Sequence, residues 1–165
     1  MKEIKAPDSL EGIDLTKTIF LAGSIAMGKA INWQEQVVEA LKDTNYIILN
    51  PRRDNWDSSW EQDITNPLFR EQVEWELDAH SKANVVGMNF DPDTKCPITL
   101  LELGIFKTKP GLIVCCPEGF WRKGNVDIVC SKYKIKQVSD LEELIKVLLE
   151  LQPKDKQEKN DEILL

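Results

Sequence analysis

Apolar runs of strand length alternate with segments of helical periodicity along most of this chain, and this alternation constrains the fold more than any other feature. The predicted strands span residues 18–22, 46–49, 85–90, 112–116 and 136–138, and the predicted helices span residues 33–41, 69–80, 98–106, 126–133 and 141–149. Strands that read as continuous hydrophobic runs are typical of parallel sheets covered by helices on both faces. We therefore expect an α/β protein with a three-layer, Rossmann- or flavodoxin-like fold and a five-stranded parallel sheet.

The length of the chain, 165 residues, suits one domain, which we place at residues 1–152. Its last helix is predicted to begin with a capping box, with Ser139 as the N-cap and Glu142 three residues later. After Pro153, residues 154–162 are nearly all charged or polar, and the final Ile163-Leu164-Leu165 is short, so residues 153–165 are expected to form a disordered tail.

The net charge of −7 and the isoelectric point near 4.9 disfavour a nucleic-acid partner or an anionic membrane surface. The N-terminal residues 1–8 lack the apolar core of a signal peptide, and no apolar run approaches the length of a membrane span. We therefore expect a cytoplasmic protein with no nucleic-acid partner and no membrane attachment.

The cysteines and the histidine do not form a recognisable metal or hydrolase motif. The four cysteines contain no CxxC pair, and the adjacent Cys115 and Cys116 sit in an apolar run, as buried strand cysteines do. His80 is the only histidine, and no nucleophile elbow accompanies it. We expect no metal, no cofactor and no disulfide framework, and we interpret His80 as a helix histidine with local hydrogen bonds.

One carboxylate, Glu102, lies inside the almost unbroken apolar run of residues 97–106. An ionised carboxylate is costly to bury, so a buried Glu102 would have to be paired, protonated or used in chemistry. The alternative is that Glu102 lies on the exposed strip of a helix whose other faces are buried. This segment alone favours neither interpretation.

A second carboxylate, Glu76, is placed unusually on the helix predicted for residues 69–80. At 100° per residue, an apolar stripe forms from Phe69, Val73, Leu77 and His80, and Glu76 lies at its edge. Glu76 is therefore a candidate partner for Glu102. The alternative is a boundary glutamate whose stem packs while its carboxylate reaches water.

Ligands of open parallel sheets bind at the carboxyl ends of the strands, where the loops after residues 22, 49, 90 and 116 emerge. These loops are expected to converge on one crevice. The polar and aromatic residues they supply are Gly23, Ser24, Arg52, Trp56, Asp91, Asp93 and Trp121. The Trp side chains would either stack on a nucleobase or bury a core or subunit interface.

Residues 23–29 match the GxxxxGK pattern of a phosphate-binding P-loop, between a strand and a helix. Ala30 replaces the hydroxyl residue that holds magnesium, so a P-loop-like phosphotransferase is only a minor alternative. We still expect this turn to contact the substrate, because a glycine turn with Ser24 beside it can bind a phosphate or a sugar hydroxyl.

Three segments together give the chain a family resemblance. They are Phe20-Leu21-Ala22-Gly23-Ser24-Ile25, then Gln72-Val73-Glu74-Trp75-Glu76-Leu77 leading to Ala83-Asn84-Val85-Val86, and finally Leu100-Leu101-Glu102-Leu103-Gly104. In this order they resemble the nucleoside 2-deoxyribosyltransferase-like superfamily, which includes the deoxynucleoside monophosphate N-glycosidases. The resemblance implies that Glu102 attacks the anomeric carbon of deoxyribose and that Glu76, where relatives carry Asp, helps to protonate the departing base.

The resemblance also implies features beyond the two glutamates. Relatives carry Asp or Ser at the position of Cys96, so Asp91 or Asp93 is expected to take over the sugar contact here. Asn125 resembles a family asparagine that enters the neighbouring subunit's pocket, which implies a homo-oligomer, a dimer or higher.

We therefore expect an enzyme that cleaves or transfers the N-glycosidic bond of a 2-deoxyribonucleoside or its 5′-monophosphate. Glu102 and Glu76 would be catalytic, while Gly23, Ser24 and Asp93 would hold the sugar. Arg52 and the Trp56 loop would contact the base. The competing class is a non-catalytic module that binds or senses nucleotides.

Overall fold

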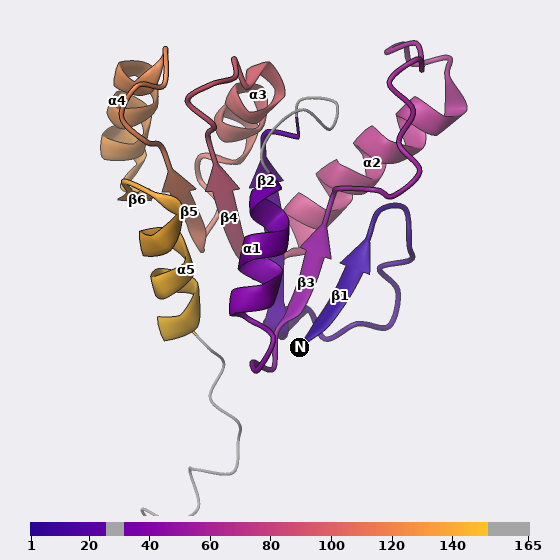
Figure 1. Ribbon diagram of the computed structural model, residues 1–165, viewed down its shortest axis with the longest axis horizontal. Helices are drawn as coiled ribbons and strands as arrows, with labels where there is room; N and C mark the ends of the chain where they lie inside the picture. Colours follow the sequence, from indigo (N-terminus) through magenta and orange to yellow (C-terminus); the bar gives the residue numbers. More distant parts are fainter. Residues whose placement is uncertain (26–31, 152–165) are drawn as a thin grey trace, which may run out of the picture.

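The computed structural model describes residues 1–25 and 32–151, which form a parallel sheet with helices on both faces (Figure 1). The strands are β1 (Lys2–Lys5), β2 (Thr18–Gly23), β3 (Ile47–Asn50), β4 (Val85–Asn89), β5 (Leu112–Cys115) and β6 (Lys136–Val138). The helices are α1 (Trp33–Ala40), α2 (Pro67–Lys82), α3 (Pro97–Phe106), α4 (Lys123–Tyr133) and α5 (Leu141–Glu150), and a short 3₁₀ helix precedes β2 (Leu15–Lys17). The expected three-layer α/β fold is confirmed.

The predicted count of five strands is wrong, because the sheet of the described residues has six. The additional strand, β1, pairs with β3 at the edge of the sheet. Ile4 is its only buried residue, whereas Lys2, Glu3 and Lys5 remain at least partly exposed. A four-residue edge strand with one core residue lacks the continuous apolar run by which the other strands were recognised.

Alternate side chains of the central strands enter two separate cores. Phe20, Val86 and Val114 pack on the face covered by α2, α3 and α4. Ile19 and Ile113 pack on the opposite face, which α1 and α5 cover. Burial on both faces explains why these strands read as continuous apolar runs.

The strand order is β1-β3-β2-β4-β5-β6, and every neighbouring pair is parallel. Without the edge strand β1, this is the flavodoxin-like order 2-1-3-4-5. The connections from β2 and from β4 lead in opposite directions, so the switch point of the sheet lies between these two strands. Ligands of doubly wound sheets bind outside the carboxyl ends of the strands at such a point.

The capping of α5 differs from the prediction by one residue. The N-cap is Asp140, not Ser139, and its side chain accepts a hydrogen bond from the backbone N–H of Glu143. The Glu143 carboxylate in turn accepts from the backbone N–H and the hydroxyl of Ser139. The capping pair is therefore Asp140 and Glu143, each one residue later than predicted.

The surroundings of the His80 side chain also differ from the prediction. Its side chain is fully buried, and its ring stacks on Phe106 with 3.7 Å between centroids. Within the described part of the chain, neither ring nitrogen has a hydrogen-bond partner. The expected local hydrogen bonds are wrong, because the ring points into the aromatic core between Phe20 and Phe106. Burial lowers the pKa of His80 to about 3.

Two predictions concern residues outside the described ranges: the P-loop-like positions Gly28, Lys29 and Ala30, and the tail at 153–165. Among the described residues, no helix has both the length and the apolar character needed to cross a membrane. Cys96, Cys115, Cys116 and Cys130 are all buried and free. Burial raises the pKa of the Cys115 and Cys116 thiols to about 12, so these two thiols are not nucleophiles at neutral pH.

Candidate active site

Helix α3 turns its carboxylate inward and several of its largest apolar side chains outward. Glu102 is only 7% exposed and shares the buried face with Thr99 and Leu103. Ile98 and Leu101, by contrast, are each 59% exposed. The exposed-strip interpretation of Glu102 is therefore wrong.

Glu102 and Glu76 interact electrostatically. Burial, together with the charge of Glu76, raises the pKa of Glu102 to about 8. Burial also raises the pKa of Glu76 to about 7, against the opposing effect of a hydrogen bond from Gln72. Two carboxyl groups that repel each other titrate as a pair. Near neutral pH this pair can hold one carboxylate and one carboxylic acid.

Glu76 reaches this position because α2 packs through a different face from the predicted one. The buried residues of α2 are Gln72, Trp75, Ala79 and His80, whereas Leu77 is 38% exposed. The Trp75 indole sets this rotation, since its N–H donates to the carbonyl of Asp8 at 2.8 Å. The predicted stripe is therefore wrong at Leu77, and Glu76 is partly buried next to Gln72.

The turn after β2 is built on close backbone contacts with the end of β4. Gly23 has φ of +146°, and a Cβ there would collide with the carbonyl oxygen of Asn89. The next residue, Ser24, donates its backbone N–H to that same carbonyl at 3.3 Å. Only glycine allows this approach, which brings Ser24 to the switch point of the sheet.

The acidic turn after β4 meets this glycine turn through Thr94. The hydroxyls of Ser24 and Thr94 are 3.0 Å apart, and Thr94 Oγ1 is also 3.0 Å from Cys96 Sγ. Asp91 is buried and accepts the backbone N–H of Asp93 at 2.9 Å, whereas Asp93 itself is exposed. Cys96 therefore contacts a hydroxyl that also contacts Ser24.

Cys96 also begins α3 in an unusual way. It is the N-cap, with φ of +46° and no side-chain capping bond, and Pro97 follows it. A left-handed conformation is uncommon for a residue with a side chain, and such strain gathers at functional sites. It occurs here one and a half turns before Glu102.

The loop after β3 carries one arginine that reaches α1 and one that stabilises the loop itself. Arg52 is partly buried, and its guanidinium lies 3.5 Å from the side-chain oxygen of Gln34. Arg53 is tied to Asn55 and Glu71 and lies over the ring of Trp60. Arg53 therefore supports the loop and is not a free donor.

The aromatic residues of the site loops pack mainly against their own neighbours. The Trp56 ring lies 5.0 Å from that of Trp60 in an edge-on arrangement, and its buried N–H has no partner among the described residues. Trp121 donates its indole N–H to the carbonyl of Lys95 at 3.0 Å and is covered by Arg122. The loop after β5 is thus fastened to the loop after β4, as the expected convergence requires.

Asn125 lies at an exposed position in the first turn of α4, directly after the loop that follows β5. Two residues of the site had no place in the sequence prediction, Gln72 and Thr94. Gln72 could have been found from its spacing, because residues four apart on a helix are neighbours and Glu76 follows it by four. Thr94 has no such signal beyond its place in the acidic turn.

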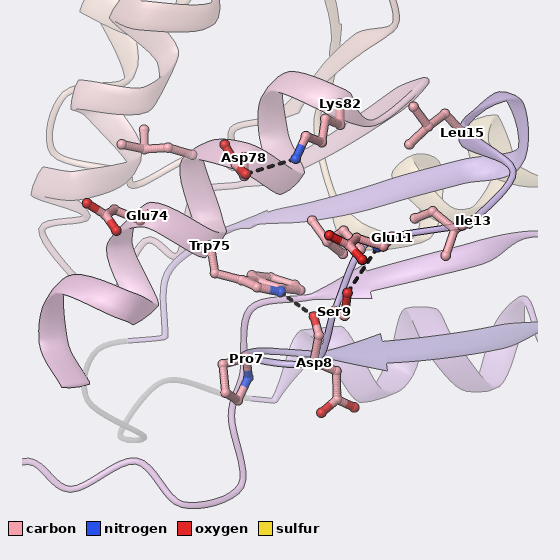
Figure 2. A pocket seen from close by; sticks show the side chains of 13 residues that line it. Pro7, Asp8, Ser9, Glu11, Ile13, Leu15, Glu74, Trp75, Asp78 and Lys82 are labelled. Carbon is pink, nitrogen blue, oxygen red and sulfur yellow. Dashed lines mark hydrogen bonds and ion pairs between the residues drawn. The ribbon is translucent and has the colours of Figure 1, made fainter. Parts of the chain in front are cut away.

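Two surface cavities lie elsewhere. One, of about 750 Å³, lies between residues 7–15 and α2 (Figure 2). Its polar groups are largely satisfied, for example by the 2.8 Å ion pair between Lys82 and Asp78. The other, of about 500 Å³, is lined by Arg52 and Arg53 among others. Neither cavity is lined by Glu76 or Glu102.

The comparisons with known proteins agree with this fold. Residues 16–120 match the family model described as nucleoside 2-deoxyribosyltransferase like. The solved structure titled "Crystal structure of conserved protein from Enterococcus faecalis V583" is similar in fold, with a TM-score of 0.58 and 14% identity over 82% of this chain and 98% of that one. No curated protein sequence matches. Since the family model spans most of the sheet and both glutamates, the chain belongs to the nucleoside 2-deoxyribosyltransferase-like family.

Proposed function

We propose that this protein cleaves or transfers the N-glycosidic bond of a 2-deoxyribonucleoside or its 5′-monophosphate, with Glu102 as the nucleophile and Glu76 as the acid and base. Membership of the family supports a glycosyl-transfer role in general. The observation that carries the specific proposal is the buried and electrostatically coupled pair of Glu102 and Glu76, which favours one negative charge and one proton near neutral pH.

The proposed reaction has two steps. In the reactive form, the single proton of the pair lies on Glu76 and Glu102 is ionised. A carboxylate oxygen of Glu102 attacks C1′ of the sugar, the bond from C1′ to the base nitrogen breaks, and its electron pair leaves with the base. Glu76 gives its proton to the departing base. Water or a second base then attacks C1′ and loses a proton to Glu76, and the bond from C1′ to Glu102 breaks.

The surrounding residues suggest where the substrate would lie. Ser24 and the acidic turn with Asp91 and Asp93 meet at the switch point, next to the N-terminal end of α3. Hydroxyl and carboxylate groups suit the hydroxyls of a sugar, so we assign the sugar to this side, along with the glycine turn at Gly23. We assign the base to Arg52 and Trp56, on the side of α2 and the loop after β3.

The direct test replaces Glu102 by Ala and follows release of free base from a panel of deoxynucleosides and their 5′-monophosphates by chromatography. Wild-type protein should release base, and Glu102→Ala should be slower by at least about 10³-fold while still binding substrate. Glu74→Gln, on the exposed side of α2, serves as the matched control and should keep full activity. Full activity of Glu102→Ala would refute the mechanism, and binding without turnover in wild-type protein would favour the nucleotide-sensing alternative.

We also propose that the active form is a homo-oligomer. Ile98, Leu101 and Ile105 form an exposed apolar stripe on α3, beside the buried face that carries Glu102. Such a stripe is typical of a protein interface. Asn125 is exposed on its own chain, which suits a side chain that serves the site of a second copy.

Mixing two inactive variants tests this arrangement. In a mixed oligomer of Glu102→Ala and Asn125→Ala chains, one site combines an intact Glu102 with an intact Asn125. Mixing should therefore restore part of the activity, and sedimentation should show an oligomer. A monomer in sedimentation, or no recovery on mixing two variants that each associate, would contradict a shared site.

A further inference from the structure

We propose that Gln72 is a positioning residue for Glu76: its amide holds one oxygen of the Glu76 carboxyl group and directs the transferable proton to the other. This inference rests on the proposed function, since it assumes that Glu76 acts as the acid. It concerns a residue to which neither the family resemblance nor the reaction assigns a role.

The amide nitrogen of Gln72 donates two hydrogen bonds. Nε2 donates to Glu76 Oε1 at 2.7 Å and to the backbone carbonyl of Pro51 at 2.7 Å. The side chain is buried, with 4% exposed, and comes from the middle of α2. Both amide hydrogens are therefore used by oxygen acceptors.

These two bonds determine which way the amide is oriented. If the amide were flipped, its oxygen would face the Pro51 carbonyl oxygen, which cannot donate a hydrogen bond. The observed orientation is thus the one that satisfies the backbone. It leaves Gln72 Oε1 buried without a partner among the described residues.

The Pro51 carbonyl connects Gln72 to the sheet. Pro51 directly follows β3, and it is buried. Gln72 therefore ties the Glu76 carboxyl group to the carboxyl end of the sheet as well as to its own helix. Since Arg52 is the next residue, the same amide couples the acid to the loop that we assign to the base.

The bond to Oε1 also decides where a proton on Glu76 resides. Gln72 Nε2 has no lone pair to offer, so Oε1 must remain the acceptor whether or not Glu76 is protonated. The proton of the acid form therefore lies on Oε2. That is the oxygen free to donate it to a departing base.

Burial disfavours the charged form of Glu76, and the charge of Glu76 in turn opposes ionisation of Glu102 from α3. Gln72, one turn earlier on α2, acts in the opposite direction, because a donated N–H stabilises the carboxylate. Removal of the amide donor should therefore shift the titration of Glu76 to higher pH. A merely structural role for Gln72 would not move this titration.

The test compares Gln72→Met, which keeps the length of the side chain but lacks the donor, with wild-type protein. The kcat for base release should fall by about 10- to 100-fold with little change in KM, because a misaligned acid slows the chemical step. The pH profile of kcat should shift to higher pH. Carboxyl ¹³C NMR of Glu76 should show the same upward shift without any need for turnover.

The control is Thr44→Val, which removes another buried side-chain hydrogen-bonding group, at the turn before β3. It should lower stability and leave both the pH profile and the Glu76 titration unchanged. An unchanged Glu76 titration in Gln72→Met would overturn the inference. If wild-type protein releases no base but Gln72→Met shifts the titration, the positioning contact stands and the proposed reaction fails.

Discussion

Helices α3 and α5 lie on opposite faces of the same sheet and differ in their N-caps and in the side chains that they bury. In α5, Asp140 caps the first turn, and Leu144, Val147 and Leu148 are buried. In α3, the side chain of the N-cap makes no capping hydrogen bond, Glu102 is buried, and Ile98, Leu101 and Ile105 are exposed. The difference indicates that α5 serves stability, whereas α3 gives up amphipathic packing to hold a carboxylate at the site.

The largest expected contrast is between two leucines. Leu144→Ala in α5 empties a fully buried position and should lower the free energy of unfolding by about 2–5 kcal/mol. Leu101→Ala in α3, at a position 59% exposed, should change it by no more than about 0.5 kcal/mol at concentrations where the chain is monomeric. Urea unfolding of both variants measures the contrast, and equal losses would contradict the exposed face of α3.

The next contrast is between a buried carboxylate in α3 and an exposed one in α5, and concerns how stability depends on pH. Because the folded pKa of Glu102 is raised to about 8, the folded state keeps a proton that the unfolded state loses above about pH 4.5. Stability contributed by this group is therefore present at low pH and is lost as the pH rises toward 8. Glu102→Gln, which cannot ionise, should raise the free energy of unfolding at pH 8 on the order of 2–4 kcal/mol.

A glutamate-to-glutamine substitution in α5 serves as the control for Glu102→Gln. Glu143→Gln should give no gain at pH 8, because Glu143 is exposed and its carboxylate accepts hydrogen bonds from Ser139. Near pH 4, Glu102→Gln should also lose its advantage. Thermal unfolding of both variants across pH 4–8 checks this, and a gain for Glu102→Gln that does not depend on pH would rule out a buried charge as its cause.

The smallest contrast is between the two N-caps. Asp140→Ala removes the acceptor of the Glu143 N–H and should cost about 1 kcal/mol. Cys96→Ala removes no capping bond and should cost less. Chemical unfolding at neutral pH, where both variants stay folded, would show the order, and a larger loss for Cys96→Ala would mean that its contact with Thr94 outweighs a helix cap.

Much of the fold could be predicted, and the exceptions have a common cause. Five of the six strands were found because burial on both faces makes them continuously apolar, and β1 was missed because only Ile4 is buried. The face of α2 was misjudged at Leu77, since the bond between Trp75 and the carbonyl of Asp8 sets the rotation of the helix. A contact between distant segments leaves no periodic signal.

The alternation of strands and helices, the loops at the carboxyl ends of the strands and the two candidate glutamates follow from the sequence alone. Only the tertiary structure decided that Glu102 points inward beside Glu76 and that Gln72 holds the latter. The physical reason is that periodicity shows which residues of a helix share a face. It does not show which face is covered when apolar residues surround almost the whole helix, because that depends on the neighbouring elements that pack against it.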